Sequence, residues 1–108
     1  MYHNDDGTGY IVVLPGILRK TLVHGDQTLM SVFQLTAGSD LPAHAHPIEQ
    51  TGYLVSGRMR LKIGDEEREL EPGCAWCIPA NVEHGAAVYE DSVAVEVFSP
   101  VREDYLPE

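Results

Sequence analysis

Two histidines separated by a single residue, His44 and His46, are the most distinctive chemical feature of the sequence. On an extended strand alternate side chains project to the same side, so the two imidazoles would have Cα atoms roughly 6.5–7 Å apart. Imidazole nitrogens at that spacing can bind one divalent metal ion together. Two surface histidines would explain the same spacing, so the pair indicates a chelate only if further ligands lie nearby. His3 and His24 have no partner at a comparable spacing, and we expect neither to be a ligand.

The residues that follow the histidine pair suggest a third ligand. Gln50 lies an even number of residues from both histidines, whereas Glu49 lies an odd number away. Because side chains alternate between the two faces of a strand, Gln50 would share the face of the histidines and Glu49 would not. Pro47 lies within this stretch and can interrupt the alternation. The pattern favours Gln50 over Glu49 as the third ligand.

A second group of candidate functional residues, Glu96, Phe98 and Arg102, lies near the end of the chain. Alternation along this run places Glu96 and Phe98 on one strand face, with Ala94, and Val93, Val95 and Val97 on the other. A partly buried carboxylate beside a metal ion can act as a general acid or base. Arg102 can bind a substrate carboxylate through two parallel hydrogen bonds. The alternatives are a solvated glutamate on an edge strand and an arginine that pairs with Glu103 or Asp104.

The two cysteines, Cys74 and Cys77, have the C-x-x-C spacing of thiol redox motifs. A redox motif of that kind opens a helix, whereas here Pro72-Gly73 precedes the first cysteine and Pro79 closes a strand-like run. Three residues apart on a strand, the two thiols point to opposite faces and cannot bond to each other. We therefore expect two packed, reduced cysteines.

Short strand-like runs separated by turn residues fill the sequence, which predicts an all-β fold without a helix. The expected strands are Tyr10–Leu14, Leu18–Val23, Thr28–Thr36, Ala43–His46, Gln50–Val55, Arg58–Ile63, Glu67–Leu70, Ala75–Ile78, His84–Val88 and Ser92–Phe98. Ser56-Gly57 and Gly64-Asp65 have the composition of tight turns, so the chain between the histidine pair and the cysteines should form an antiparallel meander.

The interior of a small barrel must be filled by large side chains. We expect Tyr53, Met59 and Trp76 to form core or cavity wall, and Tyr53 is also a candidate for contact with a ligand.

Length and charge limit the domain organisation and the partners. The 108 residues fit one domain over 1–108, with an N-terminal arm over 1–9 and a C-terminal tail over 99–108. The formal net charge of −10 repels phosphate backbones and anionic lipid headgroups. Neither a signal-like start nor an apolar run of membrane-spanning length is present. We therefore expect a cytoplasmic protein without nucleic-acid or membrane partners.

The histidine pair and its surroundings resemble the first sequence signature of the cupins. That signature consists, in this order and at fixed spacing, of a glycine, a His-x-His pair, a metal-binding glutamate and a second glycine. The glycines and histidines are matched by Gly38, His44, His46 and Gly57. Gln50 stands at the glutamate position, as in some members of the family.

The second cupin signature is also similar to a stretch of this chain. It is matched by Gly73, Pro79, Asn81 and His84. Asn81 replaces a turn glycine, which the tolerance of asparagine for left-handed backbone permits. Val88 stands where the family has an asparagine, so the last position of the signature does not match.

Together the two signatures cover residues 38–88 and imply an all-β fold, a double-stranded β-helix (jelly-roll) antiparallel barrel of the cupin type. The implied metal ligands are His44, His46, Gln50 and His84. Nickel, zinc, iron, manganese and cobalt all suit three imidazoles and one amide oxygen, so the identity of the metal stays open. Because an amide oxygen adds no negative charge, the ion should bind less tightly and polarise a ligand more strongly than beside a carboxylate.

The end of the chain resembles that of the KdgF-like uronate-linearising cupins, in which an acidic residue, a phenylalanine and an arginine line the cavity. Glu96, Phe98 and Arg102 occupy these positions, with glutamate in place of the usual aspartate. The resemblance implies a metal-dependent enzyme with these three catalytic residues. Its substrate would be a small carboxylated sugar. Its reaction would be of the isomerase or lyase type and would linearise 4,5-unsaturated uronates from pectin or alginate breakdown.

Two other functions stay open at this point. One is a cupin dioxygenase of the quercetinase type that uses a metal at the same ligands, and the other is a non-catalytic sugar-binding or sensor cupin. Many small cupins pair by exchanging an edge or terminal strand, so we also expect a homodimer. The N-terminal arm with Tyr10–Leu14 is the segment that would be exchanged.

Overall fold

The computed structural model describes residues 1–106, and in this part of the chain it contains β-strands and one short 3₁₀ helix but no α-helix. Residues 107–108 of the predicted tail lie outside the described residues. None of the described residues forms a helix long and apolar enough to cross a membrane. The elements are β1 (Ile11–Leu14), β2 (Ile17–His24), β3 (Leu29–Leu35), β4 (Asp40–His44), β5 (Glu49–Ile63), β6 (Glu66–Leu70), β7 (Ala75–Ile78), β8 (His84–Ser99) and η1 (Glu103–Tyr105).

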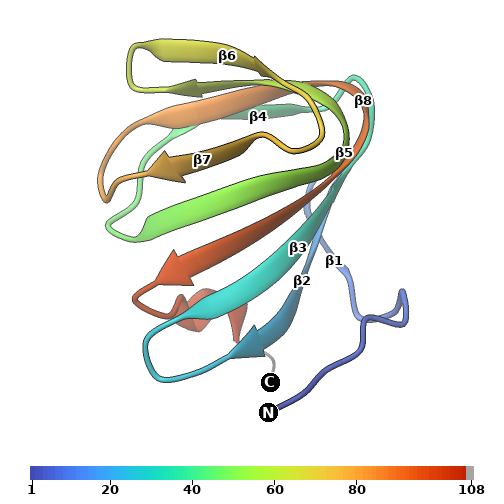
Figure 1. Cartoon of the computed structure of the whole chain (residues 1–108), viewed down its shortest axis with the longest axis vertical. Helices are drawn as coiled ribbons and strands as arrows, with labels where there is room; N and C mark the ends of the chain where they lie inside the picture. The colour runs from blue at the N-terminus through green and yellow to red at the C-terminus, as the bar shows by residue number, and fades with distance from the viewer. Residues whose placement is uncertain (107–108) are drawn as a thin grey trace.

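The strands form one antiparallel sheet that rolls around a common interior (Figure 1). Its main path runs β1-β2-β3-β8-β5-β6, while β4 pairs with β8 and β7 pairs with β5. This arrangement confirms the predicted all-β antiparallel fold. Among the described strands the path does not return from β6 to β1, so the sheet is rolled up without closing into a complete barrel.

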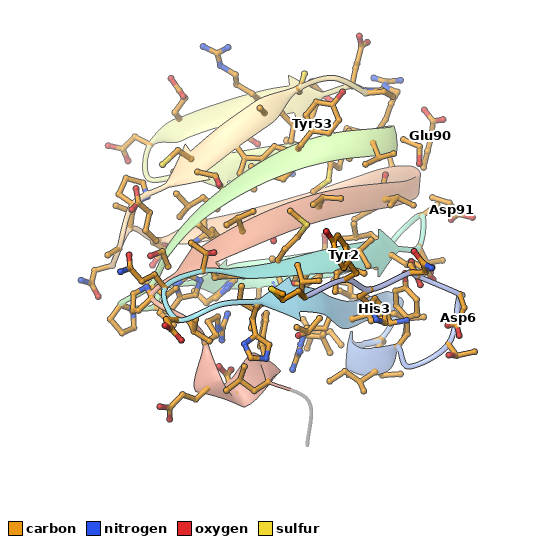
Figure 2. All side chains as sticks on the ribbon, turned by 60° about the horizontal axis from the view of Figure 1, so that its bottom comes forward. Tyr2, His3, Asp6, Tyr53, Glu90 and Asp91 are labelled. Carbon is orange, nitrogen blue, oxygen red and sulfur yellow. The ribbon has the colours of Figure 1, made fainter. Side chains whose placement is uncertain are left out.

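Two long strands, β5 and β8, pass through both layers of the roll. The first half of β8 pairs with β4 and with the second half of β5, whereas its second half pairs with β3 and with the first half of β5. Both strands therefore bend near their middle, and Figure 2 shows Glu90 and Asp91 of β8 at the end of the sheet where this bend lies. The bend brings the two ends of β8 to the same end of the molecule.

The predicted tight turn at Ser56-Gly57 is wrong, because β5 continues through it. Gly57 has φ +95° inside the strand, and the pairing of β5 with β8 shifts register on either side of it. A Cβ at Gly57 would lie 2.1 Å from Ser92 Oγ and 2.5 Å from the Asp91 carbonyl oxygen. The glycine therefore serves a bulge that bends β5 against β8. The turn predicted at Gly64-Asp65 is present between β5 and β6.

The apolar core fills one part of the space between the layers. Its central cluster consists of Ile17, Leu35, Leu54, Met59, Leu61, Leu70, Val88 and Ala94. Trp76 packs against this cluster, as predicted, but Tyr53 is 49% exposed and lies on the outer surface (Figure 2). Since Gln50 faces the interior, a residue three positions further along the strand faces outward, and the prediction for Tyr53 was wrong.

Both cysteines are free thiols, which confirms the prediction of reduced cysteines. Cys74 packs against the core, but Cys77 is exposed, so the prediction that both are packed was wrong. In β7 the neighbouring Ile78 faces inward, which turns Cys77 toward solvent.

Candidate metal centre

Three imidazoles converge at one end of the roll. His44 ends β4, His46 lies in the following loop and His84 begins β8. One ring nitrogen from each lies within 4.8 Å of the others. The His84 ring centroid is 4.2 Å from that of His44 and 5.0 Å from that of His46. The structure thus brings together three of the four side chains that the sequence singled out as metal ligands. The other two histidines, His3 and His24, are exposed and stand outside this group; Figure 2 shows His3 on the N-terminal segment.

Backbone carbonyls orient two of these rings. The His44 Nδ1 atom lies 3.0 Å from the Pro42 carbonyl oxygen, and the His84 Nδ1 atom lies 2.9 Å from the Val82 carbonyl oxygen. A carbonyl oxygen only accepts hydrogen bonds, so each Nδ1 carries the proton and each Nε2 keeps its lone pair. Metal-binding histidines are commonly held in this way.

His46 supplies the observation that tests whether a metal fits. Both of its ring nitrogens are buried and have no hydrogen-bond partner among the described residues. An unpaired polar atom is unfavourable in the interior, and a metal ion would satisfy one of these nitrogens. Burial, assisted by the neighbouring His44 and His46 rings, lowers the pKa of His84, which favours the neutral imidazole that binds metals. The donor set therefore fits a divalent transition metal.

Gln50 and Glu49 lie on opposite faces of β5, although the strand along which the alternation was counted from the histidines is interrupted by a loop between His44 and Glu49. Gln50 is 5% exposed and lines the same cavity as the histidines, whereas Glu49 is exposed. The Gln50 Nε2 donates a hydrogen bond to Glu96 Oε1 over 2.9 Å. Because the amide nitrogen is used in this way, its oxygen is the atom left to bind an ion.

Glu96 lies in the centre of the sheet, since β8 pairs with β3 on one side and β5 on the other. The alternative of a solvated glutamate on an edge strand is therefore wrong. Glu96 is partly buried, and its Oε1 accepts a second hydrogen bond, from Trp76 Nε1 over 3.0 Å. Burial raises the pKa of Glu96, while the hydrogen bonds from Trp76 and Gln50 and the charge of Arg102 act in the opposite direction.

Arg102 both lines the cavity and forms the ion pair that the sequence offered as an alternative. Its Nε and one terminal nitrogen donate to the two carboxylate oxygens of Asp104 over 3.2 and 2.8 Å. Its side chain is 17% exposed, and its guanidinium carbon lies 5.4 Å from the centre of the Phe98 ring. The guanidinium is thus held in a geometry that already binds one carboxylate.

Tyr105 is a cavity residue that the sequence analysis missed. The Arg19 and Arg102 guanidinium carbons lie 3.6 and 4.0 Å from the centre of its ring, and the Phe98 ring centre lies 5.1 Å away. The backbone around it is fixed to β2, because Thr21 donates a hydrogen bond to the Tyr105 carbonyl. Arginine and aromatic residues close together near the chain end were the available signal, but nothing local predicted that this segment folds back over β2.

The candidate site residues line one cavity of about 370 Å³. Its walls include His44, His46, Gln50, Trp76, His84, Glu96, Phe98, Arg102 and Tyr105, together with apolar side chains of the core. Apolar walls around a few polar groups are typical of sites for small molecules.

Comparisons with known proteins agree with this architecture. Residues 31–100 match a family model described as a cupin domain. The chain is 33% identical over 107 residues to the pectin degradation protein KdgF of Dickeya dadantii (strain 3937), covering 97% of each sequence. It matches the structure of KdgF from Halomonas sp. with a TM-score of 0.92 and 31% identity over 98% of each chain. An RmlC-like cupin from Shewanella frigidimarina matches with a TM-score of 0.91, but at 24% identity, over 97% of this chain and 95% of that one, it supports the fold alone.

The fold, the two histidine-bearing segments and these matches show that the chain belongs to the cupin family. Within that family it is a homologue of KdgF.

Proposed function

We propose that this chain is a metal-dependent enzyme that converts cyclic 4,5-unsaturated uronates, as released in pectin or alginate breakdown, into their linear keto form. The observation that supports this most directly is that a histidine cluster, a partly buried carboxylate and an arginine line one cavity. The volume of that cavity, about 370 Å³, suits a small ligand. The homology to KdgF, named as a pectin degradation protein, supports the same substrate class.

The proposed reaction is an isomerisation, so a proton must be removed at one position and returned at another. Opening the ring breaks the bond between the anomeric carbon and the ring oxygen; the anomeric hydroxyl loses its proton to give an aldehyde, and the ring oxygen gains a proton to give an enol. The resulting enol becomes a ketone by gaining a proton on carbon and losing one from oxygen. Glu96 can take and return these protons, because both of its hydrogen bonds end on Oε1 and leave Oε2 available.

The remaining residues would bind and orient the sugar. A divalent metal held by the three histidines and the Gln50 amide oxygen would supply a Lewis acid for the sugar oxygens. The substrate carboxylate would replace Asp104 on the guanidinium of Arg102, which already presents two donors to a carboxylate. Phe98 is 1% exposed and contributes an apolar wall beside that guanidinium.

The test follows the loss of ring-enol ultraviolet absorbance of a 4,5-unsaturated uronate. Purified protein is stripped with a chelator and reloaded separately with nickel, zinc, iron, manganese or cobalt. We expect at least one metal to accelerate the decay, and Glu96→Gln to slow it by about 10²–10⁴-fold, the usual contribution of a general acid–base group. Decay that is equal with and without protein for every metal would refute the proposal.

The same samples separate the two other candidate functions. A dioxygenase would consume dissolved oxygen with flavonol-type substrates, whereas the proposed isomerisation needs no oxygen. A sugar-binding module would bind the uronate and release it chemically unchanged.

We also propose that the chain forms a homodimer through β1. This strand lies at the edge of the sheet, and its Ile11 and Val12 are 50% and 69% exposed. Apolar edge strands readily pair with a second chain. A monomeric mass by light scattering at micromolar concentration would contradict the homodimer.

A further inference from the structure

Three neighbouring strands place Trp76, Gly52 and Glu96 in one row across the sheet. Trp76 of β7 is paired with Gly52 of β5, and Gly52 is paired on its other side with Glu96 of β8. Residues directly opposite each other in a sheet carry their side chains on the same face. Trp76 and Glu96 both line the cavity, so this shared face is the inner one, with the glycine between them.

Gly52 leaves the space that the indole occupies. A Cβ at position 52 would lie 2.2 Å from Trp76 Cε2 and 2.3 Å from Trp76 Nε1. The backbone of Gly52 is not in the positive-φ region, so its lack of a side chain, and not its conformational freedom, explains the glycine here. The indole crosses over Gly52 and donates from Nε1 to Glu96 Oε1 over 3.0 Å.

The carboxylate of Glu96 is oriented by this contact together with the one from Gln50. Both donors, Trp76 Nε1 at 3.0 Å and Gln50 Nε2 at 2.9 Å, end on Oε1. Two donors on one oxygen restrict rotation of the carboxylate, and Oε2 accepts no hydrogen bond from the described residues. One oxygen is thus anchored to the protein, and the other is available to a ligand in the cavity.

We propose that Trp76, seated on Gly52, is a positioning residue that holds the Glu96 carboxylate in the orientation needed for proton transfer. The consequence for turnover rests on the proposed function. The arrangement itself does not, because the indole N–H can be observed without any reaction.

The kinetic test compares two neighbouring positions of β7. Trp76→Phe keeps an aromatic ring over Gly52 but lacks the N–H donor, whereas Cys77→Ser changes an exposed side chain on the opposite face. If the transition state loses the stabilisation of one hydrogen bond to a charged group, the rate falls by about 10-fold or more. We expect Trp76→Phe to lower kcat by about 10-fold with KM and metal affinity unchanged, and Cys77→Ser to keep wild-type kcat. A wild-type kcat in Trp76→Phe, or a change in KM alone, would show that the indole only lines the cavity.

Gly52→Ala tests the same contact from beneath the ring. Its Cβ must displace the indole, so we expect its kcat to fall at least as far as that of Trp76→Phe. A folded Gly52→Ala with wild-type kcat would overturn the proposal. The Trp76→Phe comparison decides it if Gly52→Ala does not fold.

A spectroscopic test separates failure of this inference from failure of the proposed function. The chain has one tryptophan, so a ¹H–¹⁵N spectrum contains a single indole N–H signal. We expect that signal to shift in Glu96→Ala and to stay in place in Glu49→Ala, which removes an exposed carboxylate. An indole N–H chemical shift that is the same in Glu96→Ala as in the wild type would refute the contact between Trp76 and Glu96, even if the enzyme is active. If the indole signal shifts in Glu96→Ala but the protein does not turn over uronate, the contact is supported and only the proposed reaction is refuted.

Discussion

Replacing Gln50 by glutamate tests both contacts of this amide at once. The side chain keeps its shape, but the Nε2 donor becomes an oxygen that faces Glu96 Oε1, 2.9 Å away. Two carboxylates then share a site where position 50 is only 5% exposed. The proposed metal site gains a negatively charged ligand at the same time. The substitution should therefore destabilise the metal-free protein and strengthen metal binding.

The expected size follows from the lost hydrogen bond. A hydrogen bond to a charged group contributes about 1.5–3 kcal/mol, and the poor access of water to position 50 leaves little to replace it. A domain of this size loses roughly 5 °C of Tm per kcal/mol. The metal-free Tm of Gln50→Glu should fall by about 8–15 °C. Saturating metal should narrow or reverse that difference, because a ligand that binds the folded state more tightly stabilises it more.

Thermal unfolding with excess chelator and with excess zinc measures both effects, and calorimetric titration gives the metal affinities. Glu49→Gln is the matched control, because the adjacent side chain is exposed on the outer face of the same strand. An unchanged metal-free Tm in Gln50→Glu would show that the amide does not bind Glu96 in solution. A Tm difference that metal leaves unaltered would show that position 50 is not a ligand.

Two further predictions concern the bend and the C-terminal segment. Gly57→Ala combines φ +95° with a Cβ 2.1 Å from Ser92 Oγ, and should lower the free energy of unfolding by about 2–5 kcal/mol in urea titrations. Gly73→Ala, at φ +97° with nothing within 4 Å, should lose only about 1–2 kcal/mol, and equal losses would contradict the close approach of β8. Burial raises the pKa of Asp104, but the hydrogen bonds and the charge of Arg102 outweigh burial and leave that pKa lowered. The pair therefore stabilises the fold fully at pH values above 3.8, the ordinary pKa of the group. This stabilisation is lost as the pH falls through the lower pKa of the folded state. Asp104→Asn should lower Tm slightly at pH 7 and not at strongly acidic pH; a Tm difference that persists there would refute the ion pair as its cause.

The parts of the site that depend on local alternation could be predicted from the sequence. Glu49 and Gln50 lie on opposite faces of β5, as adjacent strand residues must, but a loop separates β4, which ends at His44, from β5, which begins at Glu49. The parity counted from the histidines along one continuous strand therefore does not explain why Gln50 is the residue that faces inward. By contrast, the placement of Glu96 and Phe98 on one face follows from alternation along β8. The left-handed backbone expected at Asn81 is also present, with φ 67°.

Features that depend on distant strands could not be predicted in this way. A glycine such as Gly57 serves a turn or a bulge equally well, and only the position of β8 decides between them. Tyr53 was assigned inward by size, although alternation from Gln50 places it outside. The contact between Trp76 and Glu96 needs the register of three strands, which no local pattern contains.

The central position of β8 has a consequence for how the molecule assembles. This strand contains His84 and Glu96, and it pairs Leu29 of β3 with Phe98, residues far apart along the chain. All three of its partners, β3, β4 and β5, precede it, so a growing chain on the ribosome holds their edges unsatisfied until β8 has been synthesised. Such long-range closure favours slow folding. Until then only His44, His46 and Gln50 of the four proposed ligands have been synthesised, so the proposed metal site is completed only when β8 joins the sheet.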